Sequence, residues 1–308
     1  MNILFLAQRV PYPPNRGDKI TSWRLIERMS RHHKVTVLAF AHDDQDRAAA
    51  RVLTEEKGIE TIAIDHDAGT QRLRSLPLLL TGKPLTLGVY GSKALQAEVD
   101  RRMGSTDFGY AFSSSMGAFF LKHSLPWVMH IAELDSDKWR QYSERTSFPM
   151  NWVYRREWKT LLRFEKRLAN AALTNVLCTP LEEAIFQREI PGPATVVLQN
   201  GVDLTYFRPA PDLAEPGRMV FTGVMDYLPN IDACVHFVRD IFPLIRAKHP
   251  EARFDIVGSK PTPEVQALGS VQGVHVTGFV EDIREWSHRA SVAVAPLRIA
   301  RGIQNKVL

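Results

Sequence analysis

The 308-residue sequence has only two cysteines, and no apolar run approaches the roughly 20 residues that a membrane-spanning helix needs. Two cysteines exclude a disulfide-stabilised scaffold, and the apolar surroundings of Cys178 and Cys234 are typical of small core residues. Residues 1–7 lack the basic start and the long apolar core of a signal peptide. We therefore expect a protein of the cytoplasm.

Two common phosphate-binding motifs are also missing. The sequence contains neither G-x-G-x-x-G nor G-x-x-x-x-G-K-[ST], which argues against dehydrogenases and ATPases. No clustered set of metal ligands is visible either. Asp135-Ser136-Asp137 has the Asp-x-Asp form, but we do not assign it to a metal. We expect neither a metal nor a cofactor.

What the chain does have is an excess of positive charge. The formal net charge is +5 at pH 7, which favours anionic partners such as nucleotides, phosphorylated lipids, membrane surfaces or nucleic acid. Nucleic acid is the least favoured of these, because the cations are scattered and no aromatic platform lies among them.

Apolar segments alternate regularly with helical patterns. Strands are predicted at 2–7, 35–41 and 59–64, with helices at 18–31, capped by Asp18, and 46–57 between them. The pattern continues with strands at 108–112, 127–131, 172–179 and 196–198 and helices at 92–103, 116–121, 150–170 and 180–189. Strands that are apolar along their whole length indicate a parallel, doubly wound α/β sheet.

A turn signal at Asn200-Gly201-Val202-Asp203 and a proline-rich segment at 209–217 indicate a domain boundary. We place the domains at 1–199 and 200–308. The alternation then restarts, with strands predicted at 219–222, 253–257, 274–277 and 291–295. Helices are predicted between them at 230–248, 263–268 and 282–288.

Several predicted strands end at glycines, where backbone N–H groups can approach a phosphate. Gly17, Gly223 and Gly258 are such positions, although a single glycine of this kind is more often just a tight turn. The segment 296–308 carries three cations and no acid beside Gly302, as an anion site at a helix start would. The alternative is a solvated basic turn.

Motifs along the whole chain resemble a group 1 (family 4) glycosyltransferase. They are Pro11-Tyr12-Pro13-Pro14 with Gly17-Asp18, Asn200-Gly201-Val202-Asp203, Phe221-Thr222-Gly223-Val224-Met225, Val276-Thr277-Gly278-Phe279-Val280 and Pro296-Leu297-Arg298 with Asn305-Lys306. Within the family the chain is most similar to the sugar transferases that accompany exosortase (PEP-CTERM) and exopolysaccharide loci.

This resemblance implies the GT-B fold, in which two Rossmann-like, doubly wound domains face each other across a cleft. It also implies metal-independent, hexosyltransferase-like transfer, with retention of configuration, from a nucleotide-diphosphate sugar to a glycan or lipid-linked acceptor in exopolysaccharide biosynthesis. The implied donor-binding residues are Gly17, Gly223, Asn230, Gly258, Arg298, Gly302, Asn305 and Lys306. Arg298 and Lys306 would neutralise the leaving diphosphate.

The chain departs from the family pattern at two places. Relatives carry an Arg and a Lys shortly after the glycine that matches Gly223, and this pair is missing here. Relatives also carry a Glu-x7-Glu pair, but Arg301 stands at the first position and the second falls beyond Leu308. These departures leave Arg298 and Lys306 with more of the phosphate charge to neutralise.

On the acceptor side, the resemblance points to the segment after the strand at 127–131. His130 would contact the transferred sugar, and Glu133 or Asp135 would accept the acceptor proton. The alternatives are a core histidine for His130 and helix-capping or surface charges for the two acids.

Helix 150–170 carries six cations against two acids and, with the leucine-rich segment 73–80, is a candidate contact with anionic lipid. That contact would lie at the inner face of the cytoplasmic membrane. The alternative is an ordinary helix that packs on the first sheet.

The second half, Gly201 to Leu308, is shorter than the roughly 150 residues of a complete Rossmann-like half. We therefore expect an incomplete second domain, a frayed terminus at Gly302 to Leu308, and weak or absent activity. Two other functions stay open: a nucleotide-sugar epimerase on the same fold, and a module that binds nucleotide sugars or glycans without chemistry.

Overall fold

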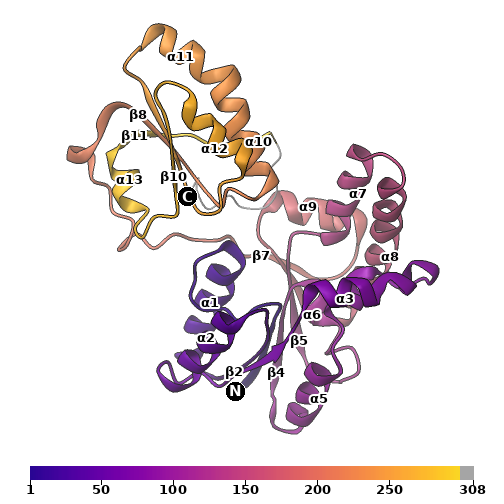
Figure 1. Cartoon of the computed structure of the whole chain (residues 1–308). Coiled ribbons are helices and arrows are strands. Elements are labelled where there is room, and N and C mark those ends of the chain that lie inside the picture. The colour runs from indigo at the N-terminus through magenta and orange to yellow at the C-terminus, as the bar shows by residue number, and fades with distance from the viewer. Residues whose placement is uncertain (299–308) are drawn as a thin grey trace. The chain divides into compact units, whose positions relative to one another are not determined.

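The chain folds into two compact units that divide after Asn200, and the computed structural model describes residues 1–298 (Figure 1). The division lies one residue from the boundary expected between residues 199 and 200. Each unit has its own parallel sheet and its own hydrophobic core, so each is described by itself.

The first unit contains a seven-stranded sheet in the order β3-β2-β1-β4-β5-β6-β7, and every pairing in it is parallel. The strands are β1 (Asn2–Ala7), β2 (Lys34–Ala41), β3 (Thr61–Asp65), β4 (Phe108–Phe112), β5 (Trp127–Ala132), β6 (Thr174–Leu177) and β7 (Thr195–Val197). The strand order reverses between β1 and β4, which is where open parallel sheets form their ligand crevice.

Helices cover both faces of this sheet, because its strands are apolar on both sides (Figure 1). In β1, Ile3 and Phe5 pack into one core, and Leu4 and Leu6 pack into the other. The helical elements are α1 (Gly17–Ser30), α2 (Asp44–Glu55), α3 (Ala68–Ser75), η1 (Leu76–Leu80), α4 (Leu85–Tyr90), α5 (Lys93–Arg102), η2 (Met103–Ser105), α6 (Ser114–Gly117), α7 (Asp135–Arg145), α8 (Met150–Ala171) and α9 (Pro180–Glu189).

Two sequence predictions for these helices need correction. Asp18 does not cap α1, because the helix begins at Gly17 and the Asp18 carboxylate accepts a hydrogen bond from Arg16 Nε at 2.8 Å. Sequence patterns also did not indicate α3, η1, α4 and α7. Most of these elements are short, and η1 and α4 are held by side chains of α8, a tertiary contact that periodicity does not reveal.

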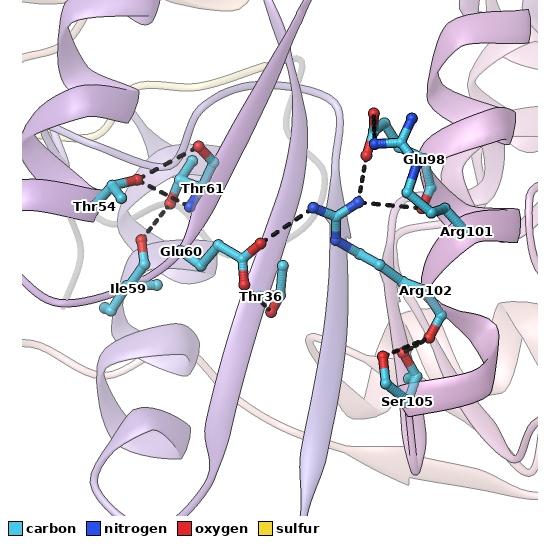
Figure 2. A network of polar contacts seen from close by, with 10 residues as sticks. Thr36, Thr54, Ile59, Glu60, Thr61, Glu98, Arg101, Arg102 and Ser105 are labelled. Carbon is cyan, nitrogen blue, oxygen red and sulfur yellow. Dashed lines mark hydrogen bonds and ion pairs between the residues drawn. The ribbon is translucent and has the colours of Figure 1, made fainter.

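A polar network fixes the C-terminal end of α5 against the sheet (Figure 2). Arg102 lies between two carboxylates: its guanidinium contacts Glu98 one turn earlier and Glu60 just before β3, the latter at 3.1 Å. Glu60 in turn accepts a hydrogen bond from Thr36 Oγ1 of β2 at 3.1 Å. The network therefore ties the last turn of α5 to β2 and to the residue before β3.

The second unit contains a four-stranded parallel sheet in the order β10-β9-β8-β11, so the reversal lies between β8 and β11. Its strands are β8 (Glu215–Thr222), β9 (Arg253–Val257), β10 (Val274–Gly278) and β11 (Ala290–Ala293). Its helical elements are η3 (Pro211–Leu213), α10 (Leu228–His236), η4 (Phe237–Ile241), α11 (Phe242–Lys248), α12 (Pro263–Ala267), η5 (Leu268–Ser270) and α13 (Arg284–Arg289). The helix predicted at 230–248 is interrupted by the π-helical turn η4.

Both cysteines, Cys178 and Cys234, are buried as thiols, which confirms their interpretation as core residues. Among the described residues, no helix combines the length and the apolar composition needed to cross a bilayer.

A very close backbone approach in the second unit joins the ends of β8 and β9. Gly258 follows β9 with φ at +153°, and a Cβ built on it would lie 1.6 Å from the carbonyl oxygen of Gly223. The Gly223 amide donates to Val257 O at 3.1 Å, and the Gly258 amide donates to Gly278 O at 3.2 Å. Only glycine lets these neighbouring strand ends lie so close together.

Gly258→Ala should therefore lower the free energy of unfolding by more than about 3 kcal/mol, because backbone must shift to admit the methyl group. Gly278→Ala is the matched control: Gly278 also has a positive φ of 71°, but no atom of the described residues lies within 4 Å of its added Cβ. Its cost should be only the about 1–2 kcal/mol of a left-handed alanine. Equal effects in calorimetric unfolding would contradict this account.

Candidate functional site

Most of the described candidate residues lie at the carboxyl edges of the two sheets, each of which has one reversal of strand order. Parallel strands bring their carboxyl ends to one edge, and residues just beyond that edge are free to contact a ligand. In the first unit, Gln8 follows β1 and Ser115 lies shortly after β4; Gln8 Nε2 donates to Ser115 Oγ across the reversal at 2.8 Å. This hydrogen bond marks the centre of the candidate acceptor edge.

His130 lies at the end of β5 but beneath this edge, with only 1% of its surface exposed. Its Nδ1 is 2.8 Å from the hydroxyl of Tyr110, and its ring packs against Phe112 with centroids 4.7 Å apart. Burial lowers the pKa of His130 to about 4, so the imidazole is neutral at physiological pH. His130 thus has the surroundings of a core histidine, which is the alternative that the sequence left open. Direct contact of His130 with a sugar stays a prediction.

The backbone around His130 is unusual. Ser113, which follows β4, and Ala132, which ends β5, have φ angles of 91° and 61°, values that favour glycine. The amide of Ser113 donates to His130 O at 2.8 Å, which links the two strand ends. Such strain persists where surrounding structure holds it, and it clusters at binding sites.

Asp135 begins α7 and is partly exposed at the same edge. Its Oδ2 accepts a hydrogen bond from Ser114 Oγ at 2.7 Å. Beneath it lies the fully buried carboxyl of Glu165 on α8, whose Oε1 accepts from the Ser136 amide at 3.3 Å and whose Oε2 has no hydrogen-bond partner among the described residues. Asp135 therefore shares its surroundings with a second acid.

The proximity of these two acids affects their protonation. Burial raises the pKa of Asp135, and burial together with the charge of Asp135 raises the pKa of Glu165 well above its ordinary value. A carboxyl with a raised pKa holds an accepted proton more tightly than an ordinary carboxyl does, which suits the predicted role of Asp135. Glu133 lies in the turn between β5 and α7 and is also partly exposed.

Sequence reasoning missed two histidines at this edge. His42 and His66 directly follow β2 and β3, and their rings are 5.1 Å apart. The buried ring of His66 also stacks on Tyr90 at 5.5 Å with an interplanar angle of 8°. The strand-end rule that singled out the glycines would have found both histidines, since each stands just after a predicted strand.

The cation of this cluster is Arg9, in the loop after β1. Burial and the nearby charges of His42 and Arg9 lower the pKa of His66 to about 4, and burial lowers the pKa of His42 as well. Both rings are therefore neutral at pH 7 and can accept or donate a single hydrogen bond. His42 Nε2 lies 3.0 Å from Gln8 O, whereas Nε2 of His66 is buried with no hydrogen-bond partner in residues 1–298.

In the second unit, four of the predicted donor-binding residues meet at the carboxyl edge of the sheet. Gly223 and Gly258 form the close approach described above, and Asn230 in α10 donates from Nδ2 to Val224 O at 2.9 Å. Arg298 follows β11, across the reversal from Gly223, and its guanidinium forms an ion pair with Asp232 of α10 at 2.5 Å. The edge thus presents a half-exposed guanidinium, while the amides of Gly223 and Gly258 donate to carbonyls of neighbouring strands.

The remaining predicted donor residues are placed differently. Gly17 is the first residue of α1 in the first unit. Gly302, Asn305 and Lys306 lie outside the described residues, as does the terminus that was expected to fray.

No metal site is apparent in the part of the chain that the structure describes, where no three His, Cys, Asp or Glu side chains are grouped to hold an ion. The Asp-x-Asp segment serves other contacts. Asp137 is buried and accepts hydrogen bonds from Arg140 Nε at 2.7 Å and Gln141 Nε2 at 2.9 Å, while Asp135 accepts from Ser114.

Comparison with known proteins matches one part of the chain to a family model and identifies the fold. Residues 216–308 match the family model "Glycosyl transferases group 1". No curated protein matches the chain in sequence. The fold is that of GT-B glycosyltransferases, which confirms the expected fold class of parallel α/β domains.

Three solved structures illustrate the likeness. OtsA in its apo form has a TM-score of 0.58 at 9% identity, over 95% of this chain and 77% of its own. A putative UDP-N-acetylglucosamine 2-epimerase from Listeria monocytogenes has a TM-score of 0.51 at 11% identity, over 95% and 73%. UGT89C1 from Arabidopsis thaliana, complexed with UDP, has a TM-score of 0.50 at 11% identity, over 95% and 74%. At these identities the likeness concerns the fold alone.

The raised pKa of Glu165 predicts a specific pH dependence of stability. Above the ordinary carboxyl pKa of 4.5, the folded protein keeps a proton that the unfolded chain has lost, so this residue makes folding less favourable as pH rises. Glu165→Gln removes that effect. The stability gained by the variant over the wild type should therefore grow as pH rises above 4.5 in urea unfolding.

Glu157 provides the matched control, because it is an equally buried acid on the same helix whose oxygens accept hydrogen bonds from Leu85 N, Thr86 N and Thr86 Oγ1. Glu157→Gln should lower the free energy of unfolding by about 1–3 kcal/mol. A Glu165→Gln variant whose difference from the wild type does not change with pH would rule out the proposed protonation.

Proposed function

We propose that this protein is a glycosyltransferase that moves a sugar from a nucleotide-diphosphate sugar to a glycan or lipid-linked acceptor. The observation that carries the proposal is the carboxyl edge of the second sheet, where Gly223 lies against Gly258 and Arg298 follows β11, the strand across the reversal of strand order. This edge lies within the segment that matches the group 1 glycosyltransferase family.

The chemistry of that edge suits a departing nucleoside diphosphate. Negative charge grows on the diphosphate as the sugar–phosphate bond breaks, and a guanidinium beside it stabilises that charge. In the free protein, Asp232 occupies the guanidinium of Arg298. A diphosphate would take over this guanidinium, so Asp232 acts as a competing anion and keeps Arg298 in place.

Two of the similar structures support a uridine nucleotide as the group to test first. One is a complex with UDP, and the other is a putative epimerase of a UDP-linked sugar. The finer parts of the proposal rest on the sequence resemblance: a metal-independent reaction, retention of configuration, and a role in exopolysaccharide synthesis.

The acceptor would bind at the edge of the first sheet, around Asp135. Its carboxylate, oriented by Ser114, is our candidate for receiving the proton that the acceptor hydroxyl loses. His130 would act from below by keeping the strained ends of β4 and β5 in position.

The similarity to an epimerase supports one other reaction class. An epimerase converts the nucleotide sugar in the absence of any acceptor. A transferase leaves the nucleotide sugar intact unless an acceptor is present. Incubation of the protein with UDP-N-acetylglucosamine alone, followed by separation of the sugars, distinguishes the two. Conversion without acceptor would favour the epimerase.

UDP should raise the melting temperature of the protein more than GDP or ADP does, because a ligand that binds only the folded state stabilises it by mass action. Arg298→Ala should weaken UDP binding about 10-fold or more, which corresponds to the loss of one charge-assisted contact. Asp232→Asn should strengthen binding, since it removes the competing carboxylate.

The control is Arg253→Ala. Arg253 is an exposed arginine at the amino end of β9, on the opposite edge of the same sheet, and its loss should leave UDP affinity unchanged. Equal affinities of the Arg298 and Arg253 variants in calorimetric titration would contradict the assignment of the donor site.

A further inference from the structure

A cavity of about 750 Å³ opens in the first unit, on the sheet face that α5, α6 and α8 cover. Its walls come from η1, α4, α5 and α8 and from the segment around α6. Leu78, Leu87, Phe119 and Phe164 give it an apolar floor. Its size and lining are those of a ligand pocket rather than a packing gap.

Five cations line the same cavity, and no acid of the described chain does: Lys83, Lys93, Lys122, Arg163 and Arg167. All five are exposed, and none forms an ion pair within residues 1–298. Asp100 acts on Lys122 from outside the lining, but its carboxylate contacts Gln96 and His123. The described lining therefore carries a positive charge that no acid within it offsets.

The fold removes the two acids of α8 from this surface. Glu157 is buried and accepts three hydrogen bonds at the start of α4, and Glu165 is buried beneath Asp135. The charged side chains that α8 exposes are consequently all cations.

The wall formed by η1 is held in place from α8. Arg156 donates to the carbonyls of Leu78, Leu79, Thr81 and Lys83, with a distance of 3.0 Å from Nε to Leu79 O. This anchoring keeps apolar side chains exposed nearby: Leu76 and Leu80 are 52% and 93% exposed. An anchored segment that exposes leucines beside a cationic pocket is suited to an amphiphile.

The cavity also reaches the candidate acceptor edge. Tyr90 and Ser115 line it, and the same two residues contact His66 and Gln8 at that edge. A molecule held in the cavity would therefore end close to the strand ends of the first sheet.

We propose that this cavity binds a phosphorylated amphiphile, whose phosphate is held by the five cations and whose apolar chain lies along the leucines and phenylalanines. The proposal rests on the proposed function, because it identifies the acceptor as a lipid phosphate. The group that receives the sugar would be at the end of this molecule that lies near the strand ends of the first sheet. Electrostatics alone would accept inorganic phosphate, and the apolar floor alone would accept an alcohol, but only a phosphorylated chain satisfies both.

Octyl phosphate, 1-octanol and inorganic phosphate form a matched set of soluble probes for isothermal titration calorimetry. Octyl phosphate should bind at least about 10-fold more tightly than either of the others, since it alone fills both parts of the site. Binding of octanol with equal affinity would overturn the proposal in favour of an apolar groove. Equal binding of inorganic phosphate would overturn it in favour of a simple anion site.

The double variant Lys93→Gln/Arg163→Gln should weaken octyl phosphate binding about 10-fold or more, at roughly a factor of 5 for each lost cation. Arg28→Gln/Arg31→Gln is the matched control: it removes the same charge from the end of α1, which packs against the other face of the sheet. Equal losses in the two double variants would contradict a specific pocket.

UDP binding, measured on the same samples, separates this proposal from the proposed function. The Lys93/Arg163 variant should keep its affinity for UDP. A wild-type protein that binds octyl phosphate but no nucleotide would contradict the transferase proposal and leave the amphiphile site standing. If the protein binds UDP but binds the three probes with equal affinity, the amphiphile site is overturned and the transferase proposal is not.

Discussion

In both units every strand runs parallel to its neighbours, so each strand delivers the residues that follow it to the same edge of its sheet. This constraint explains why residues far apart in sequence meet. Gln8 and Ser115 join across the reversal of the first sheet, and Gly223 lies across the reversal from Arg298 in the second. The parallel arrangement also requires helices on both faces, and these helices supply the rest of the candidate sites.

Helix α8 shows how one element serves stability and function together. Its Arg156 and Glu157 satisfy backbone groups of η1 and α4, two elements too short to be stable alone. Its Glu165 remains buried beside Asp135 and favours a proton there. With both acids used internally, the charged side chains that the helix exposes are cations, and a structural requirement thereby produces an electrostatic surface. The same face borders the pocket that we assign to a phosphorylated amphiphile.

The strands and the parallel α/β class were predictable from the sequence, because strands buried on both faces are continuous apolar runs. The glycines of the candidate donor edge could be placed at strand ends from the sequence, and their role in donor binding stays a prediction from the resemblance to glycosyltransferases. His42 and His66 were missed, since these histidines stand at strand ends without a motif. The sugar contact of His130 stays a prediction, and the structure adds that Tyr110 and Phe112 surround this residue and that 1% of it is exposed.

By itself, then, the sequence determined the order of the strands, the glycines that close approach demands, and an overall positive charge. Local pattern suffices for these, because hydrophobic periodicity and backbone freedom are properties of neighbouring residues. Only the tertiary structure decided which charges remain exposed, which acids are buried close to one another, and which apolar residues line a cavity. These depend on burial and on contacts between distant segments, such as Glu157 with Thr86, which no local pattern records.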